Sequence, residues 1–168
     1  IRAIDVTYEV LPAVSDERKA LAQEAPAVHT EGNRVGPPRT YERGDVAKGF
    51  TEADVILEEN YRTECEIHTP MELHGCVANW DGDRLTIWES TQGVYWVQKN
   101  VADILNLPLS KVRVIGHYMG GGFGSKLQAG KYTVIAALLA KICGRPVKLI
   151  LSREETYLTV GNRPPSNM

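Results

Sequence analysis

The sequence predicts an α+β fold, with layers of mixed sheet and helices packed on them. The first observation is a hairpin: two β-rich runs, 75–80 and 84–89, flank Asp81-Gly82-Asp83, and an Asp-Gly pair tolerates the positive φ of a tight turn. The second is the order of the segments that follow, which alternate as helix, strand, glycine-rich loop, helix and strand. Because helices that alternate with strands pack on a sheet, the two observations agree.

The N-terminal part of the chain predicts less regular structure. Residues 1–10 alternate apolar and polar side chains, as a half-buried strand does, and a short helix capped by Ser15 or Asp16 is expected to follow, ending near Glu24. Residues 29–48 are expected to form a linker, because glycine and proline recur there among charged side chains. Residues 53–65 alternate again, which predicts a long strand.

The segment after the hairpin predicts a helix and then a strand. Apolar residues recur at helical spacing over 94–105, and Ser90 or Thr91 is expected to cap this helix. The β-branched run 111–116 predicts a strand that leads into the glycine-rich loop.

A second helix is expected over 127–143, with Gly144 as its C-terminal cap, and a buried strand over 147–151. The side chains expected to form the buried face of this helix are Val134, Ile135, Leu138, Leu139 and Ile142.

Composition excludes some classes of protein. The 168 residues are 43% hydrophobic, and 19 basic against 21 acidic residues leave a net charge of −2, which argues against a nucleic-acid surface. No apolar stretch approaches the roughly 20 residues of a membrane span. The first residue is Ile1 and the last residues form a proline-rich polar stub, so we expect a piece of a longer protein. Three widely spaced cysteines predict buried thiols rather than disulfides or a metal site: Cys65, Cys76 and Cys143.

The run from His117 to Lys126 contains four glycines in ten residues and is predicted to touch a cofactor. Glycine lets a ligand approach the main chain closely, and a helix directly after the loop would offer N–H groups to an anion such as phosphate. A tight turn without a ligand is the alternative. A Walker loop is excluded because the lysine follows Ser125 instead of preceding it, and counting from Gly120 or Gly122 no glycine stands at the sixth place of a dinucleotide fingerprint.

Five short motifs occur in an order that points to one family. They are Glu72-Leu73-His74 with the strand 77–80, Ser90-Thr91-Gln92, the loop from Met119 to Lys126, Ser152-Arg153-Glu154-Glu155, and Gly161-Asn162-Arg163-Pro164. Together they resemble the large, molybdenum-binding subunit of the xanthine dehydrogenase and aldehyde oxidase family, and most closely its bacterial aldehyde oxidoreductases. The resemblance implies that residues 1–28 end a hammerhead-type domain and that residues 49–168 begin the molybdopterin-binding domain. Residues 29–48 are then the linker between the two.

The resemblance implies a molybdenum–pterin cofactor, with or without a cytosine nucleotide, and no protein atom bound directly to the metal. Gln92 then resembles the glutamine that hydrogen-bonds an oxygen ligand of molybdenum, which suits an amide because it donates without adding charge. Without the resemblance, Gln92 is a solvent-facing residue at a helix start. The cofactor-binding residues implied are Gln92, Gly121, Gly122, Phe123 and Gly124.

Two residues are expected to shape a substrate pocket. Phe123 resembles a phenylalanine beside the metal, with a core ring as the alternative. Leu127 stands where the purine-oxidising enzymes carry a glutamate, so an aldehyde or an aromatic heterocycle is favoured over xanthine, unless Leu127 belongs to a helix core. Lys126 is expected to meet a phosphate, to be solvated or to pair with an acid. For His68 and His74, structural hydrogen bonding is favoured over a metal site.

The activity implied is oxidation of an aldehyde or aromatic heterocycle with water as the oxygen source, with electrons passed to iron–sulfur and FAD partners. No catalytic residue is expected in this chain, since the family's general-base glutamate lies near the far C-terminus and neither Glu154 nor Glu155 takes that role. The isolated chain is therefore expected to be inactive. A non-catalytic module and a split-chain enzyme are the alternatives. The cytoplasm is the expected compartment, with the periplasm as the alternative.

Overall fold

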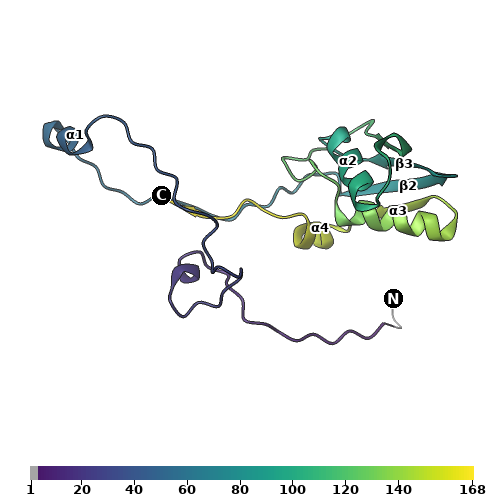
Figure 1. Ribbon diagram of the computed structural model, residues 1–168, viewed down its shortest axis with the longest axis horizontal. Coiled ribbons are helices and arrows are strands. Elements are labelled where there is room, and N and C mark those ends of the chain that lie inside the picture. Colours follow the sequence, from purple (N-terminus) through teal and green to yellow (C-terminus); the bar gives the residue numbers. More distant parts are fainter. Residues whose placement is uncertain (1–3) are drawn as a thin grey trace. The chain divides into compact units, whose positions relative to one another are not determined.

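A computed structural model describes residues 4–168 (Figure 1). The chain divides into two compact units: one reaches Tyr61 and includes Met168, and the other comprises residues 62–167. The second unit contains all of the buried hydrophobic side chains among the described residues, from Cys76 to Ala140. The fold that positions the candidate site is therefore the fold of this unit.

A four-stranded mixed sheet forms the centre of the second unit, with strand order β4-β3-β2-β5. β2 (Gly75–Asp81) and β3 (Arg84–Glu89) form the predicted hairpin, with Gly82 at φ +56° in its turn. β5 (Val147–Ile150) pairs antiparallel with β2, and β4 (Val112–Ile115) pairs parallel with β3. The expected α+β class with a mixed sheet is confirmed.

Two helices cover one face of this sheet, since their buried residues form one cluster with the inward residues of its strands. α2 (Val94–Ile104) packs against β4, while α3 (Lys131–Cys143) packs along β2 and β5. The buried strand residues lie on a single face, because Ala78 is paired with Ile87 and Ile87 with Val114. The opposite face is only partly covered.

Short elements complete the unit. A 3-10 turn, η2 (Leu109–Lys111), precedes β4, and α4 (Arg153–Thr159) begins with a capping box in which Ser152 and Glu155 exchange hydrogen bonds. β1 (Arg62–Thr63) pairs antiparallel with β6 (Ser166–Asn167) in a separate two-stranded sheet.

The first unit contains little regular structure. Within residues 4–61 it has a 3-10 turn, η1 (Lys19–Leu21), and one helix, α1 (Val46–Glu52), capped by Asp45. The predicted helix from residue 16 to 24 is thus only the turn η1, preceded by a hydrogen bond of 2.9 Å from the Arg18 amide to Asp16.

Two predicted strands are wrong. Residues 4–10 form no strand, and residues 1–3 of that prediction lie outside the described part. The long strand predicted over 53–65 is reduced to β1, and the helix α1 that precedes it overlaps the end of the predicted linker. An alternating pattern specifies a strand only where another strand pairs with its backbone, and within 53–65 only Arg62 and Thr63 have such a partner, in β6.

The helix after the glycine-rich loop differs from its prediction in two ways. It begins at Lys131 rather than 127, so the loop does not lead straight into a helix. It also buries a different face: Tyr132, Thr133, Ala136, Ala137 and Ala140 are buried, while Val134 is half-buried and Ile135, Leu138, Leu139 and Ile142 are exposed.

Small side chains explain this choice of face. Alanines bring α3 close enough to the sheet for Trp80 Nε1 to donate a hydrogen bond of 2.8 Å to the carbonyl of Ala137. Gly144 at φ +60° ends α3, as predicted. The strand expected to be buried over 147–151 is not buried. It is the edge strand β5, in which half-buried and exposed residues alternate.

The three cysteines are free thiols, as predicted, but they differ in burial. Cys76 is buried at an inward position of β2, whereas Cys65 and Cys143 are exposed. The expectation of three buried thiols is therefore wrong for two of them, because Cys65 follows the short strand β1 and Cys143 ends α3, away from the core cluster.

Candidate cofactor-binding site

The glycine-rich loop lies between β4 and α3 and has an unusual backbone. Gly121 and Gly124 have φ of +96° and +97°, which glycine adopts at little cost. Phe123 has φ of +53°, a conformation that costs a residue with a Cβ about 1–3 kcal/mol and persists only where surrounding contacts impose it. The loop is therefore held in shape by its neighbours.

Gln92 supplies the contacts that hold the middle of the loop. Its side-chain Oε1 accepts hydrogen bonds from the backbone amides of Gly124, at 2.9 Å, and Lys126, at 3.3 Å. The backbone amide of Gln92 donates to the Lys126 carbonyl at 2.8 Å. A Cβ on Gly122 would lie 2.6 Å from Gln92 Cδ, so the side-chain amide occupies the space that glycine leaves. The structure thus brings together Gln92, Gly122 and Gly124 from distant parts of the chain.

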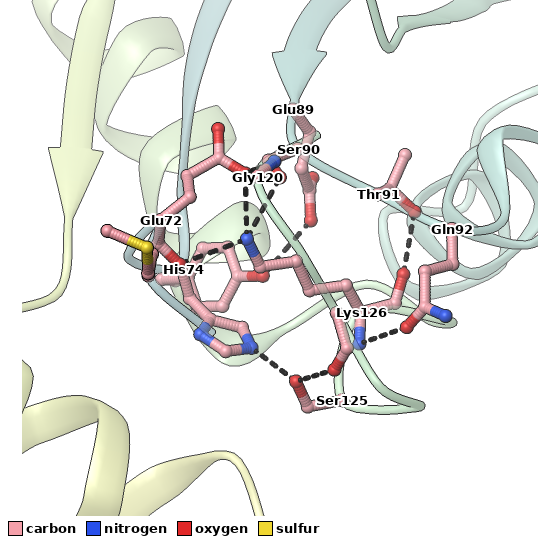
Figure 2. A network of polar contacts seen from close by, with 12 residues as sticks. Glu72, His74, Glu89, Ser90, Thr91, Gln92, Gly120, Ser125 and Lys126 are labelled. Atoms are coloured by element: carbon pink, nitrogen blue, oxygen red, sulfur yellow. Dashed lines mark hydrogen bonds and ion pairs between the residues drawn. The ribbon is translucent and has the colours of Figure 1, made fainter. Parts of the chain in front are cut away.

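These contacts orient the amide of Gln92. Because Oε1 faces two backbone donors, Nε2 points away from the loop, as Figure 2 shows. Within residues 4–168, Nε2 donates to no protein acceptor, and the residue is exposed. The site therefore presents a neutral N–H donor beside the glycine backbone.

Thr91, one of the two predicted caps of α2, does not cap the helix, because Gly93 is the N-cap residue. Its Oγ1 donates to the Lys126 carbonyl at 2.9 Å and accepts from the amide of Gly93, the residue that caps α2 without a side chain. Ser90, the other predicted cap, points elsewhere. Its hydroxyl lies between Glu72 and Lys126.

The buried Lys126 forms an ion pair with the partly exposed Glu72. Lys126 is 1% exposed, and its Nζ contacts Glu72 Oε2 at 2.9 Å, the Glu72 carbonyl at 3.2 Å and Ser90 Oγ at 3.0 Å (Figure 2). An ammonium has three N–H donors, and all three are used. Of the alternatives open from the sequence, Lys126 pairs with an acid and has no donor left for a phosphate.

Glu72 accepts several donors at one oxygen. Ser90 Oγ, the Gly120 amide at 2.7 Å and Lys126 Nζ all meet Oε2. Partial burial acts to raise the pKa of Glu72, but the hydrogen bonds from Ser90 and Gly120 and the charge of Lys126 outweigh it and hold the pKa below its usual range. Glu72 is therefore ionised at neutral pH.

His74 is buried beside this pair and connects to the loop. Its Nε2 lies 3.0 Å from Ser125 Oγ, which is 2.7 Å from the Gly122 carbonyl. If the single Ser125 proton goes to that carbonyl, Nε2 of His74 carries the ring proton and the buried Nδ1 has no partner in the described residues. Burial, and then the charge of Lys126, lower the pKa of His74. The favoured structural hydrogen bond is thus present for His74, whereas Nδ1 of His68 is buried without a partner in the described residues.

Glu89, at the end of β3, is a second buried carboxyl. Its Oε1 accepts from Thr133 Oγ1 at 3.0 Å and from Tyr132 OH at 3.2 Å, whereas Oε2 has no partner in the described residues. Burial raises its pKa to about 7, against the opposing effects of Thr133, Tyr132 and Lys126. Burial, followed by the charge of Glu89, raises the pKa of the neighbouring Cys76 thiol to about 12, so that this thiol stays protonated.

The two residues expected in a substrate pocket both lie on the surface of the unit. Phe123 is 71% exposed and Leu127 is 47% exposed, so neither is a core side chain. A hollow of about 390 Å³ lies instead on the less covered face of the sheet, lined partly by Trp88, Lys148 and Ile150. Neither Gln92 nor Phe123 lines it.

Sequence reasoning missed the role of three residues. Glu72 and Ser90 belong to motifs that carried the resemblance, but nothing in a linear sequence pairs them with Lys126. Glu89 looked like an ordinary strand end. The signal available was a charged residue at an inward position of a strand, which has to find buried partners. Among the described residues, no group of His, Cys, Asp or Glu side chains is arranged to hold a metal ion.

Comparisons with known proteins show the family to which the chain belongs. The molybdopterin cofactor-binding domain family matches residues 28–168. The aldehyde oxidoreductase molybdenum-binding subunit PaoC of Escherichia coli (strain K12) is 36% identical over 152 residues, which are 90% of this chain and 19% of that protein. The nicotinate dehydrogenase large molybdopterin subunit of Eubacterium barkeri is 35% identical over 167 residues, 99% of this chain and 39% of that protein.

A solved structure shares the fold as well. The aldehyde oxidoreductase from Desulfovibrio gigas matches with a TM-score of 0.76 and 26% identity, over 94% of this chain and 17% of that one. The chain thus spans about a fifth of PaoC and of this structure. The expected resemblance is confirmed, and with most of its length matched, the chain belongs to the molybdopterin cofactor-binding domain family.

Proposed function

We propose that this chain supplies part of the cofactor site of a molybdenum hydroxylase subunit, which oxidises an aldehyde or aromatic heterocycle with water as the oxygen source. The observation that carries the proposal is the orientation of Gln92. Its Oε1 is held by the amides of Gly124 and Lys126, so its Nε2 is presented outward as a neutral donor. Such a donor suits an oxygen ligand of molybdenum, because it adds no charge.

The residues present fit a molybdenum–pterin cofactor. Among the loop glycines, Gly124 leaves open space through which a flat pterin can approach the backbone, whereas the space beside Gly121 and Gly122 is occupied by Phe123 and Gln92. Gln92 and this backbone would hold the cofactor, with no direct protein ligand to the metal. When bound, the cofactor supplies the two-electron redox chemistry.

Phe123 and Leu127 would form the apolar wall next to the cofactor. Both side chains are exposed in the described unit, and neither carries a polar group. An apolar wall excludes water and favours substrates with few polar edges, which agrees with an aldehyde or aromatic heterocycle rather than a purine.

The remaining parts of the enzyme are proposed from the relatives. Their names, "molybdenum-binding subunit" and "large molybdopterin subunit", support further subunits, which we propose carry iron–sulfur clusters and FAD. We also propose that residues 1–28 end a hammerhead-type domain, that residues 49–168 begin the molybdopterin-binding domain, and that residues 29–48 link the two.

None of the helices of the described residues is long and apolar enough to cross a membrane. The three free cysteines favour a reducing compartment, the cytoplasm.

The test of this function is Gln92→Glu in the complete subunit that contains this chain. A glutamate can still accept from the loop amides, but it no longer offers an N–H. Turnover of an aldehyde should fall by about a hundredfold or more, as when one positioned donor is removed from an active site. Bound molybdenum and the rate are measured together.

Gln98→Glu is the matched control. Gln98 lies on α2, and its side-chain amide donates to the carbonyls of Val112 and Leu109, away from the loop. It should leave turnover nearly unchanged. Equal losses in the two variants, or full turnover in Gln92→Glu, would contradict the proposed role.

The isolated chain of 168 residues is expected to neither retain stoichiometric molybdenum nor oxidise an aldehyde with an artificial electron acceptor, since no residue here is proposed as the general base. Metal analysis and an activity assay of the purified chain check this. A complete subunit that lacks both metal and activity would instead support a non-catalytic module. Activity regained only with a second polypeptide would support a split enzyme.

A further inference from the structure

One carboxylate joins the two ends of the glycine-rich loop. At the start of the loop, the Gly120 amide donates to Glu72 Oε2 at 2.7 Å, and the Glu72 amide donates back to the Gly120 carbonyl at 3.3 Å. At the end of the loop, Lys126 Nζ meets the same Oε2 at 2.9 Å (Figure 2). A segment of seven residues, 120–126, is thus closed by a residue from before β2.

The fit at this point is close. A Cβ on Gly120 would lie 2.7 Å from Glu72 Cβ, so the loop approaches Glu72 as nearly as glycine allows. Ser90 completes the arrangement, since it donates to Glu72 Oε2 and accepts from Lys126 Nζ. Every donor of the ammonium is therefore directed inward.

Stability alone is a weak account of this ion pair. Removing charges from water costs free energy that the attraction between them often does no more than offset, and apolar side chains of similar volume fold as well or better. What an ion pair with several directed hydrogen bonds adds is a defined geometry. Here that geometry fixes the distance between the ends of the loop, whose middle is in turn held by Gln92.

We propose that Glu72 is a positioning residue that clamps both ends of the loop 120–126, and thereby sets the amides of Gly124 and Lys126 against Gln92, whose Nε2 would meet the cofactor. This inference rests on the proposed function for the identity of the ligand. The clamp itself is a property of the chain, so it can be measured without the cofactor.

The test is hydrogen exchange on the complete subunit with Glu72→Gln, which keeps the shape of the side chain and removes its charge. The amides of Gly124 and Lys126 donate to Gln92 and not to Glu72, so a change there reports positioning. Losing a hydrogen bond to a charged group should speed exchange in peptides covering 120–126 by about ten- to a hundredfold. Peptides of the hairpin, 75–89, should be unchanged. Equal acceleration in the hairpin, or none in the loop, overturns the proposal.

Asp103→Asn is the matched control, because it breaks an exposed ion pair of 2.7 Å with Lys99 on α2. It should leave the loop peptides unchanged. If Glu72→Gln yields no folded subunit, Ser90→Ala removes one of the three donors to Oε2, and a smaller acceleration confined to the loop is expected; a loop unchanged by Ser90→Ala then overturns the proposal.

A second measurement uses the loaded enzyme. The electron paramagnetic resonance signal of the partly reduced metal should shift in Glu72→Gln and not in Asp103→Asn, since only the former moves Gln92. If Glu72→Gln changes neither the paramagnetic resonance signal nor the exchange rates of the loop peptides, the proposed role of Glu72 is rejected. A complete subunit that holds no molybdenum rejects the proposed function, while the exchange comparison still decides the clamp.

Discussion

At the scale of single residues, the glycines of the loop are required for different reasons. Gly122 has no positive φ, but a side chain there would meet Gln92. Gly124 has open space around it, since a Cβ there would lie 3.9 Å from His68 Nε2, but its φ of +97° disfavours any side chain. One glycine makes room and the other makes a turn.

Gly122→Ala is therefore expected to displace Gln92 from the loop. The forced contact should lower the free energy of unfolding by about 1–3 kcal/mol, as overpacking does, and the complete subunit should lose bound molybdenum. Gly124→Ala should cost about 1–2 kcal/mol of backbone strain with a smaller loss of metal. Urea unfolding and metal analysis check both. Equal metal content in wild type and Gly122→Ala would contradict the role of Gln92.

Glu89 gives the chain a pH dependence of a definite sign. Its pKa in the folded protein, about 7, is above the ordinary 4.5, so the folded state holds the proton more tightly than the unfolded state. Its contribution to stability is fully present below pH 4.5 and is lost as the pH rises toward 7. At about 1.36 kcal/mol for each pH unit, the loss is about 3 kcal/mol.

Glu89→Gln should remove this loss, because glutamine keeps an oxygen for Thr133 and Tyr132 and carries no charge. The variant should gain stability relative to the wild type at about pH 8 more than at about pH 5, measured by urea unfolding at both values. Glu72 and His74, with lowered pKa values, favour folding at higher pH and are common to both proteins, so they cancel in the difference. If the difference in free energy of unfolding between Glu89→Gln and the wild type did not depend on pH, Glu89 would be ionised in the folded state.

At the scale of elements, α3 shows that the largest apolar side chains need not face the core. The helix has apolar residues on most of its circumference, and the choice of face depends on how near it can approach the sheet. Ala136, Ala137 and Ala140 allow an approach that leucine on the same face would prevent. Leu138 and Leu139 are left 44% and 41% exposed.

Ala137→Leu is expected to lower the free energy of unfolding by about 1–3 kcal/mol, because the new side chain has no room between α3 and β2. Leu138→Ala should change it by about 0.5 kcal/mol or less, as an exposed substitution between two good helix formers does. Urea unfolding of the isolated chain measures both. The reverse order of costs would mean that the face predicted from the sequence is the buried one.

At the scale of the whole molecule, stability is concentrated in one unit. None of residues 4–61 is buried, and apolar side chains such as Val10 and Val35 are 92% and 89% exposed. The unit of residues 62–167 holds the core cluster and the candidate site together. Burial of apolar surface is the dominant stabilising contribution, so residues 4–61 add little to it.

A chain that begins at Arg62 should therefore unfold at nearly the same urea concentration as the full chain, with the same cooperativity. Its slope against urea should also be nearly unchanged, since the slope follows the surface exposed on unfolding. Circular dichroism during urea titration measures both quantities. A markedly lower midpoint would show that the first unit stabilises the second.

The sequence by itself determined the hairpin, the helices α2 and α3 and the place of the glycine-rich loop, because each depends on neighbouring residues: Asp81-Gly82 for the turn, helical spacing for α2, Gly144 for the end of α3. The motifs of the sequence also identified the family. Only the tertiary structure decided which face of α3 is buried and which residues meet at the site. The Gln92–Gly124 and Glu72–Lys126 contacts join positions 32 and 54 residues apart, and no local pattern specifies a contact that only the packing of strands, helices and loop brings into range.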